Sequence, residues 1–249
     1  MTPALGSFGP GTLAFLAVVV FVSALIRGFS GFGYPVLVVA AGALVVNPLV
    51  LVPVAIIGDL VLGAQHWRAG KAHVQWGTVI RLVIGAGLGL LPGVWILAII
   101  DETSARIVIG VLVLLACVVM LGGWTLPGQA GPAATLGMGV VSGLAAPAGV
   151  AGPPAVTLVA ALGLSPLAFR ATLLGYFIAL DALTIGQFAL AGRIDTAALW
   201  AAGLSLPLVI TGSALGARLV IGVDPQRFRR VVIGVLALMA MIGLAKVWL

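Results

Sequence analysis

The chain has 249 residues, of which 62% are hydrophobic and only 7% are charged, whereas a typical soluble domain has about 25% charged residues. This excludes a soluble fold and predicts an all-α, polytopic integral membrane protein of the cell (inner) membrane, with the lipid bilayer as a partner. The net charge is +6, but the lysines and arginines are scattered singly along the chain. We therefore attribute it to positively charged cytoplasmic loops and expect no nucleic-acid partner.

The first half is organised around a Gly-rich break that follows the first apolar run. The stretch from Arg27 to Val38 holds three glycines and Pro35 between apolar segments. Glycine and proline break helices, and a broken helix inside a bilayer needs protein or a water-filled cavity to satisfy its backbone. The predicted helices of this half are 12–26, 34–46, 49–65, 76–98 and 106–124.

The second half repeats the first in a degraded form. The segment from Ser142 to Pro154 is again rich in Gly and Pro. Six of the seven residues 106–112 are identical to residues 230–236. Other matches follow in order, namely Asn47-Pro48 with Ser165-Pro166 and the pair Asp59 and Gln65 with Asp181 and Gln187. We therefore predict a first repeat over 1–124, a linker over 125–131 and a second repeat over 132–249.

The loop charges predict that the two repeats are inverted. If positive loops are cytoplasmic, equivalent loops must lie on opposite sides, so each repeat is a Gly/Pro-broken helical hairpin plus three transmembrane helices. The expected cytoplasmic set is Arg68, Lys71, Arg170, Arg218, Arg227, Arg229 and Arg230, and the outward set is Arg106, Arg193 and Lys246. A parallel arrangement of four spans per half divides these ten charges six to four at best, so the alternative stays open.

With its two breaks, its duplication and its loops, the chain resembles the TauE/SafE sulfite-exporter family. The motifs that carry the resemblance are 28–35, 149–154, 165–172 and the basic loop 66–76. The first half lacks a threonine that would match Thr172. The resemblance implies a secondary transporter, an exporter, of a small sulfur-containing anion such as sulfite or an organosulfonate, working by alternating access at the Gly-rich breaks.

The candidate anion site lies at the two breaks. Arginine presents a planar fork of donors that suits an oxyanion, and exposed amides and helix starts add further donors. The proposed substrate-binding residues are Arg27, Ser30, Gly31, Phe32, Gly33, Gly149, Gly152, Arg170 and Thr172. The alternatives are an interfacial, snorkelling Arg27 and an Arg170 that only anchors the cytoplasmic side.

The candidate coupling residues are two equivalent carboxylates and their neighbouring amides. An ionisable side chain within a membrane is a functional candidate by default, so Asp59, Asp181, Gln65 and Gln187 are expected to serve a coupling ion, either H+ or Na+. The alternative is a structural ion pair of an aspartate with Arg27, Arg81 or Arg170.

We expect no cofactor, no metal site and no enzyme activity. The two histidines, His66 and His73, are predicted in a solvated or interfacial loop without further ligands nearby. The segment Gly28-Phe-Ser-Gly31 matches an intramembrane protease motif, but that chemistry needs a histidine base at membrane depth. An anion channel, or a non-transporting assembly or sensor protein on the same fold, is the alternative function.

Overall fold

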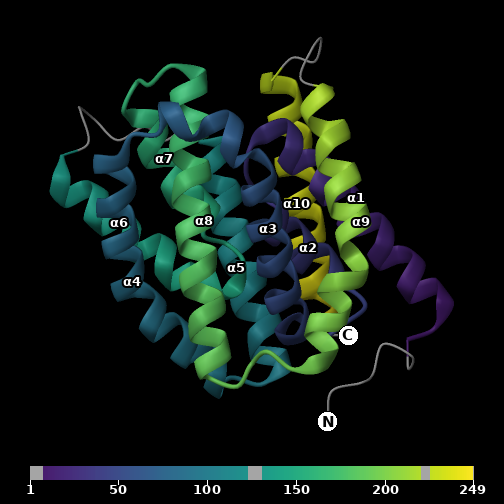
Figure 1. Cartoon of the computed structure of the whole chain (residues 1–249). Coiled ribbons are helices and arrows are strands. Elements are labelled where there is room, and N and C mark those ends of the chain that lie inside the picture. Colours follow the sequence, from purple (N-terminus) through teal and green to yellow (C-terminus); the bar gives the residue numbers. More distant parts are fainter. Residues whose placement is uncertain (1–7, 123–130, 220–224, 249) are drawn as a thin grey trace.

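The computed structural model describes residues 8–122, 131–219 and 225–248, and this part of the chain is helical without strands (Figure 1). The helices are α1 (Pro10–Ser30), α2 (Tyr34–Gly42), α3 (Pro48–Gly70), η2 (Lys71–His73), α4 (Trp76–Ile99), α5 (Glu102–Leu121), α6 (Pro132–Ala145), η3 (Ala146–Ala148), α7 (Gly152–Ala161), α8 (Pro166–Leu190), α9 (Thr196–Arg218) and α10 (Pro225–Trp248). The linker residues 125–130 and the side chains of Arg227 and Arg229 lie outside the described residues.

The helix lengths confirm a polytopic all-α membrane protein. Within the described ranges, six helices are long and apolar enough to cross a membrane: α1, α3, α4, α5, α8 and α9. The short helices α2 and α7, of nine and ten residues, are too short to cross. The chain is therefore a multi-pass membrane protein with a broken helical segment in each half.

Side-chain caps begin the long helices where polar residues precede an apolar run. The Asn47 side chain accepts a hydrogen bond from the Leu49 amide, with the two atoms 2.9 Å apart. Ser165 caps α8 in the same way, and Asp195 accepts from the Ala198 amide at 2.7 Å to begin α9. Such caps satisfy amides that have no partner within the helix. Asn47-Pro48 and Ser165-Pro166, which match each other between the two halves of the sequence, are therefore both helix starts.

Left-handed glycines make the two breaks. Gly31 and Gly33 have φ values of 86° and 97°, and Gly149 has a φ of 76°. Residues other than glycine rarely adopt these positive φ values, because their Cβ atom crowds the backbone. The chain therefore turns sharply after α1 and again after η3, and each turn leads directly into a short helix.

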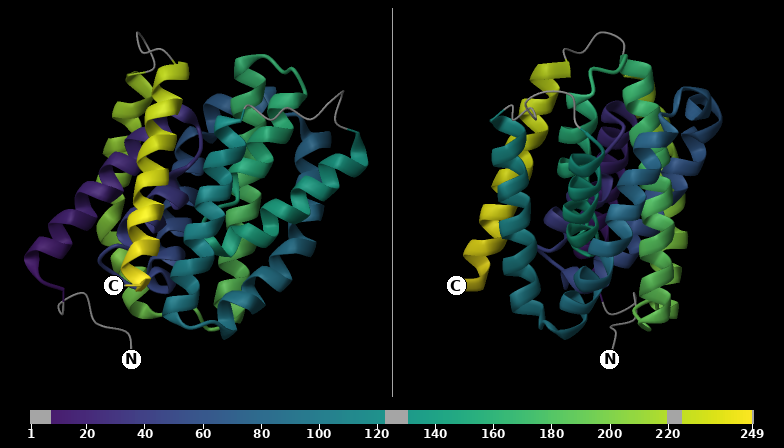
Figure 2. Two further views of the ribbon diagram at one scale, coloured as in Figure 1. Left: turned by 180° about the vertical axis from the view of Figure 1, so that it is seen from behind. Right: turned by 90° about the vertical axis from the view of Figure 1, so that its left-hand side faces the viewer.

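The first helix of each half packs along the fourth helix of the other half. A methyl group added at Gly28 of α1 would overlap the Ser213 carbonyl of α9, and one added at Gly143 of α6 would overlap the Ala86 carbonyl of α4. In the left panel of Figure 2, α1 rises inward from one lower flank and α6 descends inward from the opposite upper flank. Helices α3 and α8 pack against each other, as do α5 and α10. This packing of each first helix on the fourth helix of the other half fits an inverted duplication. The inverted relation and the repeat boundaries stay predictions.

Only some of the glycines of α4 take part in close helix packing. Gly85 and Gly89 face α6, where an added methyl group would overlap the Leu136 and Val140 carbonyls. No described residue lies within 4 Å of a Cβ atom added at Gly87. Gly87 lies two residues from each of them and therefore on the opposite face of α4, so of these three only Gly85 and Gly89 serve this packing.

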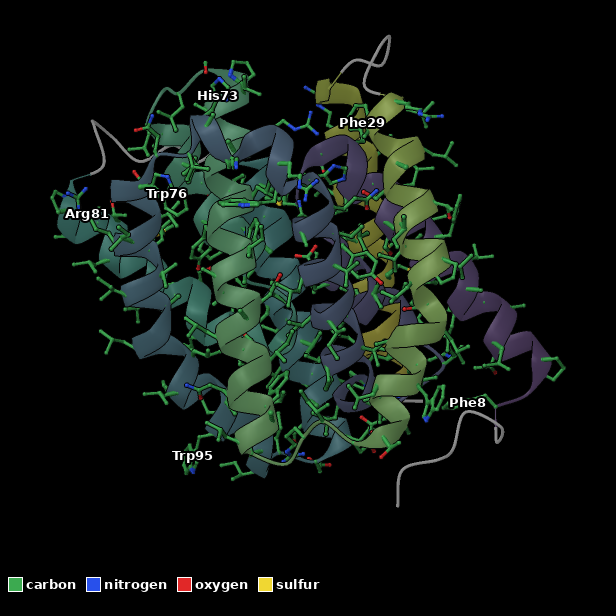
Figure 3. The ribbon with its side chains drawn as sticks, viewed as in Figure 1. Phe8, Phe29, His73, Trp76, Arg81 and Trp95 are labelled. Carbon is green, nitrogen blue, oxygen red and sulfur yellow. The ribbon has the colours of Figure 1, made fainter. Side chains whose placement is uncertain are left out.

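The connections gather at two ends of the bundle. His73, between α3 and α4, lies at the same end as the close of α9 and the start of α10, whereas Trp95 and the α8–α9 loop lie at the other (Figures 1 and 3). At this second end, Arg106, Arg193 and Lys246 donate hydrogen bonds to backbone carbonyls of other segments. These are the three basic residues that the charge argument placed on the outward side.

Candidate functional site

The two breaks meet at a cavity of about 350 Å³. A Cβ atom added at Gly149 would lie 3.4 Å from the Pro35 carbonyl oxygen, and one added at Gly152 would lie 3.8 Å from the Phe32 ring. The wall is mainly apolar, with Phe29, Phe32, Phe169 and Phe177 among its side chains. Its charged residues are Asp59, Arg170 and Asp181, and Ser30 adds a hydroxyl group. The two breaks thus build one cavity together.

Both short helices begin at this cavity. Gly33, the N-terminal cap of α2, lines it, and so do Ala151 and Gly152 at the start of α7. Helix N-termini carry a positive partial charge and free amides, which favour an anion. The backbone of both halves therefore gives the cavity wall a positive polarity.

Most polar groups of the first break already have internal partners. The Gly31 amide donates to the Arg27 carbonyl oxygen at 2.7 Å, and the Phe32 amide donates to the Ser30 hydroxyl oxygen at 3.3 Å. The Ser30 hydroxyl lies 2.8 Å from the Ile26 carbonyl oxygen and 2.7 Å from that of Phe32, and its single proton can be donated to one of them. An anion that used the Gly31 and Phe32 amides would have to displace these bonds.

Arg27 is buried in an ion pair behind the cavity wall. Its Nε donates to Asp59 Oδ1 at 2.7 Å, and the two side chains are only 3% and 4% exposed. Its guanidinium carbon lies 5.7 Å from the centre of the Phe177 ring, which adds a cation–π contact. Arg27 is therefore no snorkelling interfacial side chain. The structural pair with Asp59, weighed as an alternative from the sequence, is present.

Asp181 meets Asp59 at the centre of the bundle. Asp181 lies on α8 and Asp59 on α3, and their carboxyl groups lie close enough to interact directly. Asp181 is 7% exposed, and its Oδ2 has no hydrogen-bond partner among the described residues. Gln65 is exposed and Gln187 is half-buried, and neither contributes to the cavity wall. The structure thus brings together the two predicted aspartates but not the two glutamines.

Arg170 supplies the cation of the cavity wall. Its Nη2 donates to the Gly28 carbonyl oxygen at 3.2 Å, and its Nε lies 3.6 Å from a Cβ atom added at Gly31. Arg170 thus reaches from α8 of the second half to the first break. Thr172 has a different place, because its buried hydroxyl accepts a hydrogen bond from the Gln75 amide at 3.1 Å and so holds the chain that enters α4.

Two polar contacts beside this site were not predicted from the sequence. His66 Nε2 lies 2.8 Å from Ser213 Oγ, which joins α3 to α9. The prediction that His66 lies in a loop was wrong, because α3 continues to Gly70 and the ring is half-buried, whereas an interfacial position stays a prediction. Tyr176 donates to Ser142 Oγ at 2.7 Å, and Ser142 donates to the Ala151 carbonyl oxygen at 2.6 Å, which fixes the second break. The small residues around Ser142 and Ser213 were the only sequence signal for close approach.

The resemblance to known proteins agrees with this architecture. Residues 15–242 match the family described as sulfite exporter TauE/SafE. The chain belongs to the TauE/SafE family. Its relatives include a protein of Cupriavidus necator named "Probable sulfite/organosulfonate exporter TauE", which is 29% identical over 225 residues that cover 83% of this chain and 84% of that protein. No solved structure gives a significant match to this TauE/SafE chain.

Proposed function

We propose that this TauE/SafE protein exports a small sulfur-containing oxyanion, such as sulfite or an organosulfonate, across the inner membrane by alternating access. The name of the Cupriavidus necator relative supports the substrate class. The cavity between the two breaks supports the location of the site, because it is a mainly apolar space with few polar groups in its wall.

The observation that carries the proposal is the convergence of positive groups on one cavity. Arg170 and the N-termini of α2 and α7 line the same space. The guanidinium group can bind two oxygens of a sulfite or sulfonate side by side. The phenylalanines of the wall suit the carbon portion of an organosulfonate. The remaining proposed contacts come from Ser30, Gly33, Gly149 and Gly152. Arg27 lies behind the cavity wall, where it pairs with Asp59.

Two polar contacts would be broken and remade as access alternates. Arg170 joins α8 to the Gly28 carbonyl oxygen of α1, and His66 of α3 joins Ser213 of α9. Each contact links an element of the first half to one of the second. Movement of one half against the other would separate these pairs and open the cavity on the side where the two contacts lie.

The test is anion flux into liposomes that contain the purified protein. The panel is sulfite, thiosulfate, sulfoacetate and sulfate, and we expect saturable flux of sulfite or sulfoacetate. Arg170→Gln should reduce this flux at least tenfold, whereas Arg193→Gln should leave it unchanged, because Arg193 bonds the Ala98 carbonyl at the end of α4. Equal flux in wild type and Arg170→Gln would remove Arg170 from the site.

Counterflow separates a carrier from the alternative functions. A carrier preloaded with unlabelled anion accelerates uptake of the labelled anion, whereas a channel does not. An absence of flux for the whole panel would favour an assembly or sensor protein and would contradict transport.

A further inference from the structure

We propose that Asp59 and Asp181 hold a single proton between them and that this proton crosses the membrane together with the anion. This inference rests on the proposed transport function and specifies its coupling ion. It starts from the contact of two carboxyl groups that lie on equivalent helices of the two halves, with one arginine bonded to one of them.

The charges at the centre of the bundle do not balance if both carboxyl groups are ionised. Asp59 is neutralised by Arg27, whose Nε it accepts at 2.7 Å. Among the described residues, Asp181 has no bonded arginine and its Oδ2 has no hydrogen-bond partner, although Asp181 is only 7% exposed. Two carboxylates in contact in an apolar environment cannot both stay charged, so one of them retains a proton.

The other titratable and charged groups around Asp181 do not replace that proton. From α3 it faces Asp59, from α1 Arg27, and its own helix α8 carries Tyr176, which donates a hydrogen bond to Ser142. Cys117 of α5 is part of the cavity wall, and Tyr34 of α2 lies near Asp59. Arg170 of the cavity wall donates to the Gly28 carbonyl oxygen and keeps its positive charge for the anion, and His66 is bonded to Ser213. Asp181 is therefore the place where a proton completes the charge balance.

Protonation and anion binding favour each other at this site. With Asp181 neutral and Asp59 paired with Arg27, the positive charge of Arg170 and the two helix N-termini is left for the anion. With Asp181 ionised, its negative charge repels an anion in the same cavity. One proton enters at Asp181 Oδ2, one anion enters beside Arg170, and both leave at the other face. For a dianion, one negative charge still crosses, so an inside-negative membrane potential still favours export.

The experiment compares wild type with Asp181→Asn, which resembles the protonated carboxyl group in shape and charge. In wild type, a pH gradient should drive sulfite accumulation, and sulfite affinity should fall about tenfold per pH unit above the range in which the pair is protonated. Asp181→Asn should lose gradient-driven accumulation and lose this slope. Sulfite titrates identically in all samples, so the difference between variants reports the protein.

The matched control is Glu102→Gln, which removes an exposed carboxylate in a pair with Arg106 at the far end of the bundle. It should behave as wild type. An unchanged pH slope or an unchanged gradient response in Asp181→Asn would overturn the proton role while leaving anion transport intact. A wild type without sulfite counterflow would instead contradict the proposed transport function.

A second measurement does not depend on transport. The infrared band of a protonated carboxyl group should be present in wild type at neutral pH, lost in Asp181→Asn and kept in Glu102→Gln. A wild-type spectrum without this band at neutral pH would overturn the shared proton even if anion flux were demonstrated.

Discussion

The two helix breaks have the same backbone design and different chemistry. Each turns through left-handed glycine and leads into a short helix whose N-terminus lines the cavity. The first break carries Arg27 and Ser30, whereas the second contains no charged residue and is fixed by the bonds of Ser142. Geometry is therefore duplicated while charge is not, and the arginine of the first break pairs with Asp59 of its own half.

The largest expected effect comes from removing the cation of the first break. Arg27→Ala leaves Asp59 buried, ionisable and unpaired, which typically costs about 3–5 kcal/mol. We expect a large fall in thermal unfolding temperature in detergent. Glu102→Ala, which breaks the exposed pair with Arg106, should cost less than about 1 kcal/mol.

The double variant Arg27→Met with Asp59→Leu checks this explanation, because it removes both charges at once. It should recover most of the stability lost in Arg27→Ala while transport stays low. If Arg27→Ala unfolds at the wild-type temperature, the buried pair does not stabilise the first break.

The next effect tests whether the stability of the protein depends on the close contact between α4 and α6. Gly89→Ala forces a methyl group into the Val140 carbonyl of α6, so α4 and α6 must separate. We expect a loss of about 1–3 kcal/mol, as for other overpacked sites. Gly87→Ala on the same helix meets open space and should be neutral or stabilising by up to about 1 kcal/mol, since alanine favours helix. Equal effects of the two substitutions in thermal unfolding would contradict the packing described.

A smaller effect compares the turns themselves. Gly149→Ala and Gly33→Ala both place a side chain at positive φ, which costs about 1–2 kcal/mol. Gly149→Ala also crowds the other break, at Val39 and Pro35, whereas none of the residues that the structure describes lies within 4 Å of a Cβ atom at Gly33. Unfolding temperatures should therefore rank Gly149→Ala below Gly33→Ala, and the reverse order would show that the breaks do not rest on each other.

The smallest effect concerns one buried tyrosine near each break. Tyr176→Phe removes a hydrogen bond to Ser142 and should cost about 1 kcal/mol. Tyr34 is fully buried, and its hydroxyl has no partner among the described residues. Tyr34→Phe should leave the unfolding temperature unchanged or raise it, because no bond is lost and a polar group is no longer buried. A destabilised Tyr34→Phe would reveal a bond to the hydroxyl that the structure does not describe.

The sequence predicted those features that depend on neighbouring residues. Hydropathy over a helix length predicts membrane spans, and glycine with proline predicts the breaks near Gly31 and Gly149. The polar residues Asn47 and Ser165 predict helix starts because a cap bonds to amides only two or three residues away. The helix that contains His66 was predicted too short, since polar residues after an apolar run resemble a loop when their tertiary partner, Ser213, is not considered.

The sequence by itself determined that the chain crosses the membrane and is broken in two places, because these properties are local sums of hydrophobicity and backbone preference. Only the tertiary structure decided that Arg27 pairs with Asp59, that Asp59 meets Asp181, and that Arg170 reaches the first break. These partners lie 32, 122 and 142 residues apart. Their meeting depends on how α1, α3 and α8 pack, since the charge of a side chain does not specify its partner.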